Sequence, residues 1–377
     1  MSLTEALFFA LDMHKTAIQN RLDVYFRKNN KGEPMSQQAY SKCRSKFDHT
    51  PFSTLFKAMV QKEYSGEYKL PLWHGYHLFS IDGIYLNLPK EDVLKTEFGT
   101  YGSDDNVCAG SSILYDVLHG WAINPILANS YMNERAECLN HLNFINSELS
   151  HIKDNIILLL DRGYPSEEIF SELQSSGVKF LIRCSSKAIS EIRDAPMGDS
   201  IIYRNGMKLR VYKFLLSTSE VEILVTNLFD IPEELLSELY SLRWCIETMF
   251  NVLKNQLCIE KFTGRSVNAI KQDYWATLIL INTVAVYQNN TNTIVAEKRS
   301  MKKNKHKYKV TTSKLIISLR DNFVLAGLGL KSTNPAVEMK KIIEEIVRNV
   351  TPIRPNRSFE REKNKISKDK TNLKSHL

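Results

Sequence analysis

The spacing of apolar residues changes near residue 76, and this change separates regions of different secondary structure. Residues 1–75 place apolar and aromatic side chains three or four positions apart, which is typical of helices. The stretch YHLFSIDGIYLNLP, which begins at residue 76, alternates loosely and is rich in aromatic and β-branched residues, so it predicts a strand. We therefore expect a small helical region followed by a sheet.

Residues 76–184 follow the order strand, strand, strand, helix, strand, helix, strand. Two strands are predicted in SSILYDVLHGWAINPILANS, with a turn at His119-Gly120. NIILLL holds five successive apolar residues, as expected for a strand buried on both faces. The helix after it has Ser166 as a candidate cap and Gly177 as a stop. This succession predicts an α/β domain with a mixed sheet.

Residues 185–230 interrupt the alternation with a β-rich segment. Asn205-Gly206 between two apolar runs is the strongest short hairpin signal, and EVEILVTNLFD adds one more strand. Helical spacing returns after Pro232, and a second long apolar helix, DYWATLILINTVAVY, is expected to end near residue 287. Beyond this helix, EKRSMKKNKHKYK and the tail from Arg354 are basic and poor in apolar side chains, and the tail is predicted to be disordered.

One predicted helix, YSLRWCIETMFNVLK at residues 240–254, carries an unusual set of polar residues. At 100° per residue, Tyr240, Arg243, Glu247 and Lys254 fall within a wedge of about 60°, apart from the apolar face. For an isolated helix, a solvated polar face is the simplest interpretation. A functional interpretation depends on what the rest of the chain places opposite this wedge.

Composition and cysteine usage narrow the class of protein. The 377 residues suffice for two or three domains, and 43% are hydrophobic and 24% charged, as in soluble globular proteins. No apolar run approaches the ~20 residues that span a bilayer, so no membrane association is expected. The N-terminus lacks the basic start of a signal peptide, and the six cysteines form no Cys-x-x-Cys pair. These features predict a protein of the reducing cytoplasm.

Charge is distributed unevenly along the chain. Residues 76–230 contain 13 basic and 21 acidic residues, whereas residues 291–377 contain 21 basic and 8 acidic ones. Residues 1–75 are also basic, with 11 basic against 7 acidic residues. An acidic centre suits divalent cations and basic flanks suit phosphate backbones, so this pattern favours a metal-dependent protein that binds nucleic acid.

Three carboxylates are the candidate catalytic residues. Asp82 lies inside a predicted strand, where Asp is disfavoured, and Asp161 follows the buried strand, at the sheet edge where ligands bind. Taken singly, Asp82 could face solvent, Asp161 could form a turn, and Glu247 could be a surface residue. Together they could hold two Mg²⁺ ions, because Mg²⁺ prefers oxygen ligands and two such ions promote phosphoryl transfer.

The chain offers no other recognisable catalytic motif. It has no glycine-rich phosphate loop, no Gly-x-Ser-x-Gly elbow and no His-Glu-x-x-His pair. The three carboxylates are therefore the best candidates for chemistry.

The Tyr-x2-Arg-x3-Glu-x6-Lys spacing at 240–254 resembles the Tyr-Arg-Glu-Lys signature of bacterial DDE transposases of the insertion-sequence-four type. SIDGIYLNLP resembles the strand that carries the first Asp of that family, and LLLDRGYPS resembles the strand of the second Asp. SQQAYSKCRSKF and RPNRSFEREKNK resemble its N-terminal helical segment and its basic C-terminus. The likeness covers roughly residues 35–370.

The resemblance implies an RNase H-like mixed sheet with a β-rich insertion, preceded by a small helical domain and followed by a helical, basic C-terminal region. The implied parts are a helical DNA-binding region, the two halves of the catalytic core around the insertion, and a basic region for DNA binding or dimerisation. Their boundaries are expected at residues 1–75, 76–184, 185–230, 231–290 and 291–377.

The resemblance also implies roles for individual residues. Asp82, Asp161 and Glu247 would bind two Mg²⁺ ions, with Mn²⁺ as a substitute. The expected contacts to the DNA backbone are Tyr240, Arg243 and Lys254, with Arg162 and Tyr164 as further candidates. Trp244 is equally compatible with a core position and with capture of a displaced base. Residues 185–230 contain no Trp, so the sequence leaves open whether a DNA hairpin forms.

The predicted function is a DDE transposase that binds terminal inverted repeats, cleaves DNA with two metal ions and joins the 3′-OH to target DNA. A homodimer on DNA, acting in the bacterial cytoplasm at the nucleoid, is expected from the family. Two alternatives remain: an RNase H-like metal-dependent nuclease without strand transfer, and a domesticated transposase derivative that only binds DNA.

Overall fold

The computed structural model describes residues 1–11, 16–28, 31–102, 105–185, 189–216, 219–300, 306–327, 340 and 343–353. The described chain forms two compact units. The larger unit comprises residues 49–254 and 259–278, and the smaller comprises 1–48, 255–258 and the part from 279 onward. The basic stretch that begins at Arg354, including RPNRSFEREKNK, lies outside the described residues.

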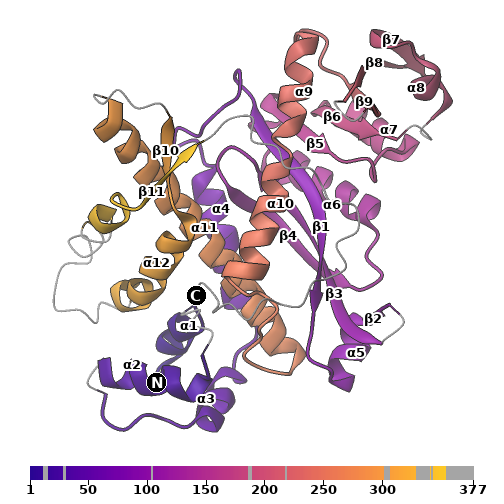
Figure 1. The fold of residues 1–377 in the computed structure, drawn as a ribbon. Helices are drawn as coiled ribbons and strands as arrows, with labels where there is room; N and C mark the ends of the chain where they lie inside the picture. The colour runs from indigo at the N-terminus through magenta and orange to yellow at the C-terminus, as the bar shows by residue number, and fades with distance from the viewer. Residues whose placement is uncertain are drawn as a thin grey trace. The chain divides into compact units, whose positions relative to one another are not determined.

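The larger unit is built on one mixed sheet (Figure 1). Its strands follow the order β2-β3-β1-β5-β6-β9-β8-β7, and β4 also pairs with β3. The strands are β1 (His77–Asn87), β2 (Thr100–Tyr101), β3 (Asn106–Asp116), β4 (Trp121–Asn129), β5 (Ile156–Leu160), β6 (Lys179–Cys184), β7 (Gly198–Arg204), β8 (Met207–Leu215) and β9 (Val221–Thr226).

Five of these strands form the catalytic-core topology that was expected. β1, β3 and β4 are antiparallel neighbours, whereas β1, β5 and β6 are parallel to one another. All five residues of β5 are buried, as their unbroken apolar run predicts. The order β4-β3-β1-β5-β6, with three antiparallel strands followed by two parallel ones, is that of an RNase H-like sheet. The predicted fold class is confirmed.

The β-rich segment extends the same sheet. β9 pairs with β6 in antiparallel orientation, and β8 and β7 follow it. The β7–β8 hairpin turns at Asn205 and Gly206, whose φ angles of 48° and 78° are the positive values that a two-residue turn of this kind needs. The predicted strands are therefore present, joined edge to edge with the core strands.

Helices connect and cover the strands of the larger unit. They are α4 (Thr50–Glu63), α5 (Asp92–Phe98), α6 (Glu134–Glu148), α7 (Glu167–Ser176), α8 (Ser190–Asp194), α9 (Glu233–Ser241), α10 (Trp244–Asn251) and the first part of α11 (Val267–Ser300). α7 begins and ends as expected. The Ser166 hydroxyl accepts a hydrogen bond from the Ile169 amide at 3.2 Å, and Gly177 ends the helix with a φ of 74°.

The smaller unit contains the N-terminal helices and the chain after α11. α1 (Leu3–Leu11), α2 (Ile18–Lys28) and α3 (Gln37–Arg44) share an apolar cluster that includes Phe9 and Leu22. The remaining elements are α12 (Thr312–Gly327) and the antiparallel pair β10 (Lys307–Val310) and β11 (Val350–Ile353). The helical character predicted for residues 1–75 is confirmed by α1 to α4.

Two helix predictions need correction. The apolar helix expected to end near residue 287 continues to Ser300 as α11. The segment 240–254, expected as one helix, consists of the end of α9, then α10, and a π-helical turn at Val252–Gln256. No helix in the described parts of the chain is long and apolar enough to cross a membrane.

Candidate active site

Asp82 and Asp161 lie side by side because of the register between β1 and β5. The paired residues run from His77–Ile156 to Ser80–Leu159, and continuing this parallel register by two residues places Asp82 opposite Asp161. Each carboxylate accepts a hydrogen bond from a nearby glycine amide: Gly83 donates to Asp82 at 2.8 Å and Gly163 donates to Asp161 at 2.7 Å. The sheet therefore brings together two of the three predicted catalytic residues.

Arg243 joins the third carboxylate to the first. Its Nη2 atom donates a hydrogen bond to Glu247 Oε1 at 2.6 Å, and its Nη1 atom donates to Asp82 Oδ2 at 3.3 Å. Arg243 is only 6% exposed, so the guanidinium is shielded from water, whereas the side chain of Glu247 is 36% exposed. Glu247 and Asp82, 165 residues apart in the sequence, are thus held by one guanidinium.

The polar wedge of residues 240–254 differs from a solvated helix face. Tyr240 and Arg243 are buried, which excludes solvent exposure as the explanation for them. The backbone amides of Leu242 and Arg243 donate to carbonyls three residues back, so the chain tightens between α9 and α10. Despite this break, Arg243 and Glu247 remain four residues apart on one side of the chain and contact each other.

Burial and neighbouring charges shift the pKa of Asp82. Burial raises the pKa of this carboxyl to about 6, although the Gly83 amide and Arg243 act in the opposite direction. The charges of Asp161 and Glu134 raise it further. Asp82 therefore lies among carboxylates that repel one another when no further cation is present.

Glu134, the first residue of α6, is a fourth carboxylate that the sequence analysis missed. A Cβ atom on Gly83 would lie 2.7 Å from Glu134 Oε1, so the side chain of Glu134 fills the space beside this glycine. A Cβ on Gly163 would lie 3.8 Å from Glu134 Oε2 and 3.1 Å from Asp161 Oδ1. The only sequence signal for this contact is the glycine near each Asp, in Asp-Gly and Asp-Arg-Gly.

The other predicted contacts to DNA occupy different surroundings. Lys254 donates a hydrogen bond to the Tyr85 carbonyl at 2.7 Å and lies 3.4 Å from Glu260. In the described part of the chain it does not contact the three carboxylates. Arg162 is exposed, whereas Tyr164 is 1% exposed. Trp244 is 42% exposed, and the Arg243 guanidinium lies 5.5 Å from its ring centroid.

The donor atoms around Asp82 and Asp161 suit a divalent metal ion. Carboxylate oxygens are the ligands that Mg²⁺ prefers, and the guanidinium of Arg243 already occupies a cation position between Asp82 and Glu247. Among the described residues, no three His, Cys, Asp or Glu side chains are gathered closely enough to hold a metal ion as they stand. One or two carboxylates with water and a substrate phosphate are sufficient for Mg²⁺, so the residues fit the ion.

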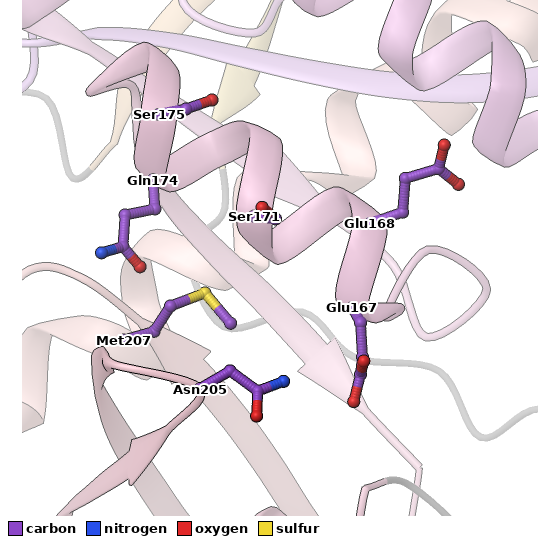
Figure 2. A pocket seen from close by; sticks show the side chains of 7 residues that line it. All are labelled: Glu167, Glu168, Ser171, Gln174, Ser175, Asn205 and Met207. Carbon is purple, nitrogen blue, oxygen red and sulfur yellow. The ribbon is translucent and has the colours of Figure 1, made fainter.

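A separate pocket of about 550 Å³ lies between α7 and the β7–β8 turn (Figure 2). Its lining residues are Glu167, Glu168, Ser171, Gln174, Ser175, Asn205 and Met207. None of the predicted catalytic residues lines it. Arg204, at the end of β7, pairs with Glu167 and Glu191 and ties the hairpin to α7 and α8.

Comparison with known proteins supports the predicted class. Residues 131–283 match the family model described as "Transposase DDE domain". Asp161, Arg243 and Glu247 lie inside the matched region, and Asp82 precedes it. This match supports a DDE transposase, while the insertion-sequence-four type and its four-residue signature remain predictions.

Among solved structures, the chain is similar to a piggyBac transposase in a synaptic complex with hairpin DNA, solved by cryo-EM. The two chains share 13% sequence identity with a TM-score of 0.44, over 92% of this chain and 75% of the other. No curated protein sequence matches the chain.

Proposed function

We propose that this chain is a DDE transposase that cleaves DNA at the ends of an insertion sequence and joins the freed 3′-OH to target DNA. The observation that carries the proposal is that Arg243 hydrogen-bonds to both Asp82 and Glu247, while the β1–β5 register places Asp82 next to Asp161. The match of residues 131–283 to the transposase DDE domain supports it.

The chemistry requires two substitutions at phosphorus. In the first, a water oxygen bonds to the phosphorus as the bond to the 3′ oxygen of the element breaks, which leaves a 3′-OH and a 5′-phosphate. In the second, that 3′-OH attacks a phosphodiester of the target and displaces its 3′ oxygen. Two Mg²⁺ ions, or Mn²⁺ in their place, would lower the barrier to both steps when bound. Asp82, Asp161 and Glu247 would supply oxygen ligands for these ions.

Arg243 is the residue best placed to hold a DNA phosphate. Its Nε atom is buried and has no hydrogen-bond partner among the described residues, so a phosphate oxygen could accept from it once the guanidinium leaves its place between Asp82 and Glu247. Arg162 is exposed beside Asp161 and could contact the same strand, as could Lys254 and the buried Tyr240 and Tyr164 after local movement. The indole of Trp244, which is 42% exposed and lies beside the Arg243 guanidinium, would stack on a base.

Recognition of the DNA ends is assigned to the basic regions. Residues 1–75 and 291–377 carry the excess of basic side chains, and a positively charged surface binds the phosphate backbone independently of sequence. Two ends must be cut and joined together, so we propose a homodimer on DNA, acting at the nucleoid of the bacterial cytoplasm.

The first test replaces each carboxylate in turn. Asp82→Ala, Asp161→Ala and Glu247→Ala should each abolish Mg²⁺-dependent cleavage of a duplex that carries the element's end, while binding of that duplex is retained. Asp154→Ala is the matched control, because Asp154 is an exposed carboxylate just before β5. Cleavage that persists in one of the three variants would remove that residue from the catalytic set.

The second test separates transposase from the two alternatives. Pre-cleaved ends with a free 3′-OH should be joined to a supercoiled target plasmid in the presence of Mg²⁺. Cleavage without joining would favour the metal-dependent nuclease, and binding without either reaction would favour the domesticated DNA-binding derivative. Inverted repeats flanked by short direct repeats around the gene would add independent support for transposition.

A further inference from the structure

Glu134 is held close to both strand aspartates by the start of α6. The Arg135 Nε atom donates a hydrogen bond to the Gly163 carbonyl at 3.0 Å, which ties the first turn of α6 to the loop that follows Asp161. Glu134 Oε2 and Asp161 Oδ1 both lie within 4 Å of the point where a Cβ on Gly163 would be. Because residue 163 is glycine, no side chain of its own fills the space beside these two oxygens.

Only two of the four carboxylates of the site, Asp82 and Glu247, are paired with a positive charge among the described residues. Arg243 pairs with Asp82 and Glu247, but no cation pairs with Glu134 or Asp161 among the described residues. Among the described residues, no group donates a hydrogen bond to Glu134 either. Burial, followed by the charge of Asp161, raises the pKa of the Glu134 carboxyl. A half-buried carboxylate that faces another carboxylate without a counter-ion is costly, and a bound cation would relieve that cost.

A second observation points to a ligand at the same place. The hydroxyl of Tyr164 is buried and has no hydrogen-bond partner among the described residues. Tyr164 directly follows Gly163, beside which the oxygens of Glu134 and Asp161 lie. Burial first, and then the charges of Asp82, Glu134 and Asp161, raise the pKa of this hydroxyl. Buried polar atoms normally have partners, and an ordered water or a hydrated ion beside the carboxylates would provide one.

We propose that Glu134 is a fourth metal-binding carboxylate, which together with Asp161 forms a divalent cation position separate from the one that Arg243 occupies between Asp82 and Glu247. Two carboxylates are enough for Mg²⁺ or Mn²⁺ when water and a DNA phosphate complete the coordination. This inference rests on the proposed function, because it adds a ligand to the same metal-dependent centre.

A purely structural role for Glu134 predicts different behaviour. An acidic residue in the first turn of a helix is stabilised by the helix dipole, and Glu134 shares this position with Glu137. If the dipole were the reason for Glu134, Glu134→Gln and Glu137→Gln would lower the melting temperature of the metal-free protein to similar extents. If Glu134 is instead an uncompensated charge at a metal position, Glu134→Gln raises that melting temperature.

The experiment is a titration of the full chain with Mn²⁺ in the absence of DNA, with free Mn²⁺ followed by electron paramagnetic resonance. We expect Glu134→Gln to weaken binding at one site about tenfold or more. We expect Glu137→Gln, which removes the same charge from the same helix turn, to change it less than about twofold, in keeping with a screened surface charge. Equal affinities in the two variants would overturn the proposal.

Gly83→Ala provides a second variant that leaves every carboxylate in place. The added methyl group would lie 2.7 Å from Glu134 Oε1, so the glutamate side chain must move away. Gly83 does not have a positive φ, so alanine fits its backbone. If both Gly83→Ala and Glu134→Gln bind Mn²⁺ more weakly than the wild type, the proposed position of the metal ion is supported. If both variants bind Mn²⁺ as the wild type does, a metal ion at this position is excluded.

The outcomes for the inference and for the proposed function are distinguishable. If Mn²⁺ binding depends on Glu134 but the wild-type chain neither cleaves nor joins end-containing DNA, the metal position stands and the transposase proposal fails. If the chain cleaves DNA and Glu134→Gln binds Mn²⁺ as the wild type does, the transposase proposal stands and the role of Glu134 is refuted.

Discussion

The guanidinium of Arg243 donates a hydrogen bond to the carboxylate of Glu247 at 2.6 Å. The same guanidinium donates a hydrogen bond to Asp82 at 3.3 Å. Its positive charge therefore lies between two carboxylates that are proposed to bind divalent metal ions. A metal ion that uses both carboxylates must therefore displace Arg243. The displaced guanidinium would be free to bind a DNA phosphate, which links metal binding to DNA binding.

The first prediction concerns this competition. Arg243→Gln should raise the affinity of the DNA-free protein for Mn²⁺ by about tenfold or more, because the variant lacks the cation that competes for Asp82 and Glu247. In the wild type, bound end DNA should raise Mn²⁺ affinity, and this gain should be lost in the variant. Isothermal titration calorimetry with and without a duplex of the element's end measures both effects.

Lys254→Gln is the control for the first prediction. It removes one positive charge from the same segment, but Lys254 contacts the Tyr85 carbonyl and Glu260 rather than Asp82, Asp161 or Glu247 among the described residues. Its Mn²⁺ affinity should remain close to that of the wild type. A similar gain in both variants would show that net charge, and not the Arg243 contacts, sets the affinity.

The second prediction follows from the cost of burying Asp82. Its folded-state pKa of about 6 lies above the value of 3.8 for an unperturbed Asp, so the folded protein retains the proton longer than the unfolded chain does. Stability is therefore lost as the pH rises from about 4 to 6. Asp82→Asn should raise the free energy of unfolding of the metal-free protein at pH 7 by at most about 3 kcal/mol. Thermal melts at pH 4 and pH 7 test this, and a variant that is less stable at pH 7 would contradict it.

The third prediction concerns His141, a fully buried residue of α6. Its ring hydrogen-bonds with the Ser112 hydroxyl at 2.9 Å and the Asn124 amide at 3.1 Å, and burial lowers its pKa to about 3. Between pH 6.5 and 3 the unfolded chain therefore binds a proton that the folded protein excludes. This residue alone should reduce the free energy of unfolding by about 1.4 kcal/mol for each unit of falling pH in that range.

In His141→Gln, the free energy of unfolding should depend less steeply on pH. Its value at pH 7 should be lower than in the wild type, because the buried hydrogen bonds change. Urea midpoints at pH 7, 6 and 5 give the slope directly. An unaltered slope in His141→Gln would refute the prediction.

The fourth prediction concerns a buried contact between Tyr64, which follows α4, and Asp116, the last residue of β3. The Tyr64 hydroxyl donates a hydrogen bond of 2.8 Å to Oδ2 of Asp116, whose side chain is fully buried. Tyr64→Phe leaves that oxygen without its donor and should lower the free energy of unfolding by about 1–3 kcal/mol. Tyr68→Phe, at an exposed tyrosine, should have no measurable effect in the same melts.

Local patterns were sufficient to predict much of the fold. The apolar run at Ile156–Leu160 forms a strand buried on both faces, and the Asn205-Gly206 turn forms the expected hairpin. Each of these signals depends on a few neighbouring residues. The attachment of β9 to β6 was not predicted, because strand pairing across a long separation leaves no trace in local spacing.

The limits of the site prediction have a similar cause. Helical periodicity placed Arg243 and Glu247 on one side of a helix correctly, but it could not show that Arg243 is buried against Asp82. Periodicity also did not predict the break between α9 and α10. At this break the backbone amides bond to carbonyls three residues back, and the side chains still point in nearly the same direction as in a continuous helix. Glu134 was missed because its proximity to Gly83 and Gly163 depends on the way α6 packs on the sheet.

The two glycines beside the aspartates also carry information about sequence variation among related chains. Any larger side chain at position 83 or 163 would compete for space with the carboxylate of Glu134 or Asp161. Relatives that replace Glu134 by a shorter residue should therefore tolerate alanine or serine at position 83, whereas those that keep the glutamate should keep the glycine. Coordinated substitution at positions 83 and 134 would thus record, in sequences alone, a contact between β1 and α6.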